Sequence, residues 1–138
     1  MLHQKQKGPS CYFVAACNAL DIVVDRDVER EYNVYVSNHY LEEAAGVMHR
    51  YIGMMLPCRF STFVRGLSEE IPQTGKGVIV VGYGFGGCHA VAYDSGMICD
   101  SMEPDKVFIS FEEYNRKALK GHGWIIEIIP LDEKKGES

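Results

Sequence analysis

The stretch KQKGPSCYFVAACNAL, residues 5–20, begins with polar residues and becomes almost wholly apolar from its cysteine onward. Pro9 and Ser10 are typical of the first turn of a helix, and neither proline nor glycine follows between Cys11 and Leu20. The pattern therefore predicts a helix from Cys11 to Leu20. A helix with almost no polar face is usually buried on most sides, so we expect this one inside the fold.

The composition is that of an ordinary globular domain, because 46% of the 138 residues are hydrophobic and 24% are charged. The net charge is -5, and lysine and arginine form no stripe of the kind that binds nucleic acid. The start MLHQKQKG lacks the apolar core of a secretory signal, and no apolar run approaches the roughly 18 residues that span a bilayer. We expect one domain over residues 1–131, a disordered tail over 132–138, and a cytoplasmic protein that binds neither nucleic acid nor membranes.

The cysteines argue against a disulfide framework and against a standard zinc module, since their number is odd and they form no C-x-x-C pair. They are Cys11, Cys17, Cys58, Cys88 and Cys99. Neighbouring residues of a strand point to opposite faces, so Cys88 and His89 would rarely bind one metal ion. We therefore expect free thiols in a reducing compartment, with neither a metal nor a cofactor.

The middle third of the chain has a helical pattern, from Asp27 to about Ile71. Its longest run is NHYLEEAAGVMHRYIGMM, residues 38–55, and Ser61 is a candidate N-cap for a helix over TFVRGLSEEI, residues 62–71. These segments predict a helical layer.

The pattern changes after this layer, where short β-branched or aromatic runs separated by glycines predict strands. The runs are residues 77–83, 88–94, 97–100 and 106–110, followed by a short helix over 111–119 and a last strand over 124–131. GYGFGG, residues 82–87, matches the nucleotide-binding pattern G-x-G-x-x-G, but that motif needs a helix after it and here a strand is expected. Helices followed by an antiparallel sheet indicate the α+β class.

DSG, residues 94–96, is a tight-turn signal between two of these strands. It would pair the strand that contains His89 with the strand that ends at Asp100, in antiparallel orientation. With a bulge or a small register offset, the side chains of His89 and Asp100 would lie near each other at one end of the sheet.

Cys11, His89 and Asp100 together have the chemistry of a cysteine nucleophile. The positive end of a helix dipole lowers the pKa of a thiol, and Cys11 starts the predicted helix. The imidazole of His89 can accept and return the proton while Asp100 orients the ring. Gln6, an amide donor just ahead of Cys11, can join the Cys11 backbone N–H to bind an oxyanion. The alternative is that Cys11 is a core thiol like Cys17 and that His89 is structural.

The motif HQKQKGPSC, residues 3–11, resembles the nucleophile motif of Josephin-type deubiquitinases, which reads approximately His-x-Lys-Gln-x-Gly-x-x-Cys. More broadly, the order of glutamine, cysteine, histidine and aspartate is similar to that of the papain-like cysteine peptidase superfamily, including the peptidase domains that trim bacteriocin leaders. The resemblance implies a papain-like fold with a catalytic helix and a helical layer packed on the sheet. It implies Cys11 as nucleophile, His89 as general base and acid, Asp100 as orienting residue and Gln6 as oxyanion donor. Gln4 is the alternative donor, because many relatives place the glutamine six residues before the cysteine, where this chain has Lys5.

Three functions fit this set of residues. The first is a peptidase or isopeptidase that forms an acyl-thioester on Cys11, with a protein or peptide substrate that could carry a ubiquitin-like tail. The second is a glutamine deamidase or an acyl or amide transferase with the same triad. The third is a catalytically silent protein-binding module.

Overall fold

The computed structural model describes residues 1–38, 56, 58–60, 64–68, 71–84 and 87–133, which form an α+β fold as predicted. The described helices are α1 (Cys11–Ala19), α2 (Arg26–Asn38) and α4 (Phe111–Ala118). The described strands are β1 (Cys58–Phe60), β2 (Val64–Ser68), β3 (Lys76–Tyr83), β4 (Gly87–Asp94), β5 (Met97–Asp100), β6 (Glu103–Phe108) and β7 (Gly123–Glu133). The predicted first helix and the predicted strands are thus present, with small differences at their ends.

The described strands form one seven-stranded sheet in the order β1-β7-β3-β4-β5-β6, and β2 also pairs with β7. Each pairing between these strands is antiparallel. The DSG turn is a two-residue hairpin in which Asp94 pairs with Met97. Ser95 and Gly96 both have positive φ, at 51° and 83°, which is the geometry of a type I′ turn. The predicted hairpin between β4 and β5 is confirmed.

The predicted helix over residues 62–71 is wrong, because Val64–Ser68 is strand β2. Val64 pairs with Ile128 and Ser68 pairs with Ile125, so the segment adds a strand beside β7. Gly66 and the β-branched Val64 are weak helix formers, and pairing with β7 decides the conformation. Of the other predicted helix, residues 38–55, only Asn38 is described, as the last residue of α2; the rest lies outside the described residues.

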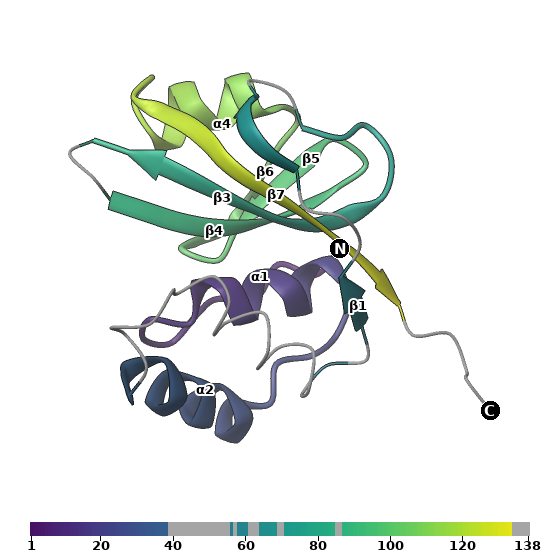
Figure 1. Ribbon diagram of the computed structural model, residues 1–138, viewed down its shortest axis with the longest axis vertical. Coiled ribbons are helices and arrows are strands. Elements are labelled where there is room, and N and C mark those ends of the chain that lie inside the picture. The colour runs from purple at the N-terminus through teal and green to yellow at the C-terminus, as the bar shows by residue number, and fades with distance from the viewer. Residues whose placement is uncertain (39–55, 57, 61–63, 69–70, 85–86, 134–138) are drawn as a thin grey trace.

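The helices lie on both faces of the sheet. Figure 1 shows α1 between the sheet and α2, while α4 packs on the opposite face. Among the described residues, none of the helices is both long and apolar enough to cross a membrane.

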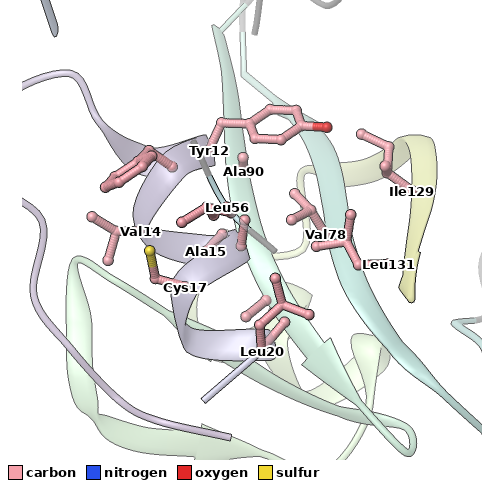
Figure 2. Packing of buried hydrophobic residues seen from close by; sticks show 14 of the residues in the cluster. Tyr12, Val14, Ala15, Cys17, Leu20, Leu56, Val78, Ala90, Ile129 and Leu131 are labelled. Atoms are coloured by element: carbon pink, nitrogen blue, oxygen red, sulfur yellow. The ribbon is translucent and has the colours of Figure 1, made fainter. Parts of the chain in front are cut away.

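Two clusters of buried side chains correspond to these two faces. The α1 cluster joins α1 to sheet residues Val78, Ala90, Ala92 and Ile129. Figure 2 shows Tyr12 and Ala15 of α1 close to this part of the sheet. The α4 cluster contains the residues of opposite parity, Ile79, Val81, Val91, Tyr93 and Ile98, with Phe108, Phe111 and Tyr114. The sheet thus has an apolar residue pattern on both faces, which explains why its strands read as nearly continuous hydrophobic runs.

The last strand runs two residues further than the domain boundary expected at residue 131. Asp132 pairs with Arg59 and Glu133 pairs with Cys58, so β1 keeps the end of β7 in the sheet. Residues 134–138, the remainder of the predicted tail, lie outside the described residues.

Candidate active site

Cys11 is the first residue of α1, and its side chain is partly buried. Its sulfur accepts hydrogen bonds from the backbone N–H groups of Tyr12 and Ala90, and it is hydrogen-bonded to the side chain of His89. Cys17, by contrast, is only 1% exposed and lies in the α1 cluster. The thiol at the start of α1 is therefore in contact with the predicted base, at the positive end of the helix dipole.

The β4–β5 hairpin brings His89 and Asp100 together. The Nε2 atom of His89 lies 2.7 Å from Oδ1 of Asp100, which leaves Nδ1 as the ring nitrogen available to the Cys11 sulfur. The regular pairing of the hairpin ends at Ala92 and Cys99, one residue before Asp100. A register shift between Cys99 and Asp100 in the pairing of β5 with β6 occurs at the same place. The β4–β5 pairing itself has no register shift, so the expected offset lies on the other side of β5, and the contact between His89 and Asp100 forms beyond the last regular pair of the hairpin.

The carboxylate of Asp100 is held on both of its oxygens. Oδ1 also accepts the backbone N–H of Met102 at 2.8 Å, and Oδ2 accepts the hydroxyl of Tyr114 at 2.7 Å. Asp100 is 5% exposed, so these bonds form in a largely water-free environment where they are strong. The carboxylate is fixed in one orientation relative to His89.

The charged forms of Cys11, His89 and Asp100 stabilise one another. Burial raises the pKa of the Cys11 thiol, but the hydrogen bond and positive charge of His89, together with the backbone N–H groups of Ala90 and Tyr12, bring that pKa below its usual value. Burial lowers the pKa of His89, but Asp100 and Cys11 raise it to about 10. Burial raises the pKa of Asp100, and the hydrogen bond and charge of His89 reverse this, so that the pKa lies below the usual carboxyl range. These shifts all favour the ion pair of a Cys11 thiolate and a His89 imidazolium beside the Asp100 carboxylate.

Gln6 and Gln4 have different surroundings. Both ends of the Gln4 amide are used inside the fold: Nε2 donates to Asn18 and Ile22, and Oε1 accepts the N–H of Val24. Gln6 instead places Oε1 against the hydroxyl of Ser101, at 2.6 Å, so this end of its amide is fixed. Its Nε2 donates one hydrogen to the carbonyl of Gly8 and has a second hydrogen to offer. Of the two candidates, the geometry therefore favours Gln6 as the oxyanion donor.

Ser101 and Gln6 are linked twice, since the Gln6 backbone N–H also donates to the Ser101 carbonyl at 3.2 Å. We expect Ser101→Ala to lower kcat/KM for an amide substrate about tenfold, because the freed amide of Gln6 can rotate away from the oxyanion. Alkylation of Cys11 by iodoacetamide should be unchanged, because that reaction forms no oxyanion. An equal loss in both reactions would mean that Ser101 acts on the thiol instead. Ser101→Ala should also have no further effect once Gln6 is replaced by alanine.

The segment before α1 is held by a buried acid, Glu29 of α2, which is 1% exposed. Its Oε2 accepts the hydroxyl of Ser10 at 2.6 Å and the backbone N–H of Lys7 at 2.9 Å, and its Oε1 accepts Nη1 of Arg26 at 2.8 Å. Burial raises the pKa of Glu29, but the bonds from Ser10, Arg26 and Lys7 lower it by more. Ser10 is the N-cap residue of α1, yet its hydroxyl binds Glu29 rather than capping the helix. Glu29 therefore anchors the chain between Gln6 and Cys11.

Three residues of this site were not predicted: Ser101, Tyr114 and Glu29. Each acts through a contact between distant parts of the chain, such as the 95-residue separation of Ser101 from Gln6. The adjacency of Ser101 to Asp100 was the one local signal that could have pointed to it. Glu29 and Tyr114 look like ordinary members of amphipathic helices, so the sequence alone contains no signal for them.

No protein-family model matches the chain, and no curated protein or solved structure is detectably similar to it. Within the described part of the chain, no group of three or more histidine, cysteine or acidic side chains is arranged to bind a metal ion.

Alkylation of Cys11 should stay fast well below about pH 8.5, the usual pKa of a thiol. The pKa of Cys11 is lowered and that of His89 is raised to about 10, so the pH range in which thiolate and imidazolium coexist is wider than for an unpaired thiol and imidazole. Reactivity should decline only on the acid side, as the pH falls through the lowered pKa of Cys11. Iodoacetamide rates measured between about pH 5 and about pH 9, followed by peptide mapping, test this. The exposed Cys88 is the internal reference, and a Cys11 rate that merely parallels it would contradict the prediction.

Proposed function

We propose that this protein is a papain-like thiol hydrolase that cleaves peptide or isopeptide bonds through an acyl-thioester on Cys11. The observation that carries the proposal is the continuous hydrogen-bonded array of Cys11, His89 and Asp100. A structural histidine needs only one such partner, whereas a nucleophile–base–orienter set needs both. The resemblance of residues 3–11 to the Josephin motif supports the same reading.

The architecture agrees with the papain-like part of the proposal. A buried helix that begins with the nucleophile packs against an antiparallel sheet, and the base and the acid lie on consecutive strands of that sheet. Gln6 precedes Cys11 in the sequence, and its side chain accepts a hydrogen bond from Ser101, the residue that follows Asp100. The order in sequence and the neighbours in space are those expected for that superfamily.

The reaction follows from the geometry. The Cys11 thiolate attacks the amide carbonyl, and the oxyanion is held by the Gln6 side chain and by the Cys11 backbone N–H, which has no acceptor within its own helix. The His89 imidazolium donates its proton to the leaving amine. The neutral ring then takes a proton from a water molecule that attacks the acyl-thioester; the C–S bond breaks, the carboxylic acid product leaves, and the thiolate and imidazolium are restored. Asp100, bonded to Nε2, keeps the other ring nitrogen directed at the sulfur throughout.

The proposed substrate class rests on the partial burial of the Cys11 sulfur and on the resemblance of residues 3–11 to the Josephin motif. The sulfur is partly buried, so the chain that reaches it must be slim near the scissile bond. A glycine-rich tail, such as that of a ubiquitin-like protein, meets this requirement, and so does any flexible peptide with small residues at the cleavage point.

Covalent probes test the proposal. A ubiquitin-tail electrophile and a generic peptide electrophile are each offered to the native chain, to Cys11→Ala and to Cys88→Ala, which removes the exposed thiol. Labelling should be lost only in Cys11→Ala, and preference for the tail probe would favour the isopeptidase reading. If neither probe labels Cys11, the hydrolase proposal fails.

The same samples distinguish the alternative functions. A deamidase leaves its target intact and heavier by about one dalton, and a transferase joins it to an amine acceptor; mass spectrometry detects either. A silent binding module would show Cys11 alkylated no faster than Cys88 at neutral pH.

A further inference from the structure

A chain of hydrogen bonds connects α4 to the nucleophile across the end of the sheet. The hydroxyl of Tyr114 donates to Oδ2 of Asp100 at 2.7 Å, and Oδ1 of Asp100 lies 2.7 Å from Nε2 of His89. His89 is in turn bonded to Cys11. Tyr114 belongs to the α4 cluster, whereas Cys11 packs against the α1 cluster. The array therefore spans both faces of the fold.

The ring of Tyr114 is held firmly, which gives its hydroxyl a fixed direction. Tyr114 is 0% exposed, and its ring packs edge-on against Phe108 with the ring centroids 5.1 Å apart. A second ring, Phe111, lies 6.4 Å away in a tilted arrangement. The helix that carries Tyr114 is itself capped, because the Ser110 side chain accepts the N–H of Glu113. The hydroxyl thus has little freedom to leave Asp100.

We propose that Tyr114 is a positioning residue, whose hydroxyl locks the carboxylate of Asp100 in the orientation that aligns His89 with Cys11. The inference rests on the proposed function and adds a fourth residue to its machinery. A phenylalanine ring could fill the same apolar space, so packing alone does not account for a phenol whose oxygen reaches a buried carboxylate. Without this donor, Oδ2 would be a charged oxygen with no partner in the position that Tyr114 now fills, and the carboxylate could rotate away from the imidazole.

Two consequences follow for Tyr114→Phe. Misalignment of His89 should lower kcat/KM for an amide substrate about tenfold. Burial raises the pKa of Asp100, and the hydroxyl of Tyr114 is one of the groups that lower it, after His89 and the backbone N–H of Met102. Removal of this hydroxyl should also leave the imidazolium of His89 less well aligned with the sulfur, so that the thiolate is less stabilised, the pKa of Cys11 rises, and the acid limb of Cys11 alkylation moves to higher pH by about one unit.

The experiment compares pH profiles of Cys11 alkylation and kcat/KM for native protein, Tyr114→Phe and Tyr93→Phe. Tyr93 is the matched control: it is a 1%-exposed tyrosine of the same cluster, so its replacement also removes a buried hydroxyl. Both variants should lose some thermal stability, but only Tyr114→Phe should shift the acid limb. An unshifted limb in Tyr114→Phe, or an equal shift in both variants, would overturn the inference.

A double-mutant cycle with Asp100→Asn tests whether Tyr114 acts through Asp100. Adding Tyr114→Phe to Asp100→Asn should cause no further shift, because the charge that the hydroxyl positions is already absent. A full additional shift would show that Tyr114 acts elsewhere and would overturn the inference. A native Cys11 that reacts no faster than Cys88 would instead overturn the proposed function, and the inference with it. If native Cys11 shows the predicted enhanced reactivity and Tyr114→Phe does not change its pH profile, the inference alone is overturned.

Discussion

His89→Ala is expected to lower kcat/KM for amide hydrolysis by about 10⁴-fold, and it should also remove the unusual reactivity of Cys11. In the proposed mechanism the imidazole of His89 has two roles. It stabilises the thiolate by a hydrogen bond and a positive charge, and it supplies the proton that the leaving amine needs. Loss of both returns Cys11 to a thiol whose burial raises its pKa, so alkylation near pH 6 should become very slow.

The matched control is His122→Ala, which removes an exposed histidine that precedes β7 and should leave the activity unchanged. Steady-state hydrolysis of a fluorogenic amide and iodoacetamide labelling near neutral pH measure the two roles separately. If His89→Ala kept more than about a tenth of the native kcat/KM, His89 would not be the base. A far-UV circular dichroism spectrum like that of the native protein would show that the loss is chemical rather than a failure to fold.

Glu29→Ala should produce the largest loss of stability, about 3 kcal/mol at neutral pH. The substitution removes a carboxylate and leaves the buried Ser10 hydroxyl, the Lys7 N–H and the Arg26 guanidinium without the acceptor that they share. The segment that carries Gln6 would lose its attachment to α2, so kcat/KM should fall together with the free energy of unfolding. Urea unfolding measures the first effect, and Glu31→Gln, on an exposed position of the same helix, is the control.

The pH dependence of this effect has a definite sign. The pKa of Glu29 is lowered in the folded state, so its contribution is present above the unfolded value of about 4.3 and is lost as the pH falls through the folded value. The stability difference between the native protein and Glu29→Gln should therefore shrink in acid. A difference that stays constant at low pH would mean that the ionised carboxylate contributes nothing.

The sequence was sufficient to predict the helix that begins at Cys11, the strands of the second half and the contact between His89 and Asp100. These predictions succeeded because each depends on local signals: a long apolar run, β-branched runs, and a two-residue turn with glycine that sets the register. The segment Val64–Ser68 was misread because its conformation is decided by pairing with β7, more than fifty residues later. The secondary-structure propensities of residues 64–68 do not reveal that a distant strand will pair with them.

The residues of the candidate site also divide into those that local signals predict and those that depend on distant contacts. Cys11, His89 and Asp100 could be predicted because their residue types are chemically distinctive and their order fits a known scheme. The groups that hold them could not, since a serine, a tyrosine and a glutamate are common on any surface. Their roles exist only once the end of β5, the helix α4 and the helix α2 have brought Ser101, Tyr114 and Glu29 against Gln6, Asp100 and Ser10, respectively.

The peptide bond between Asp100 and Ser101 joins two parts of the site that could otherwise be adjusted separately. Asp100 directs the imidazole, and Ser101 directs the amide of Gln6. A displacement of the chain at this one point would therefore change proton transfer and oxyanion binding in concert, and neither could be retuned by a backbone shift that spares the other. Variation at residues 100 and 101 should for this reason be strongly epistatic, so that the effect of a substitution at one position depends on the residue at the other.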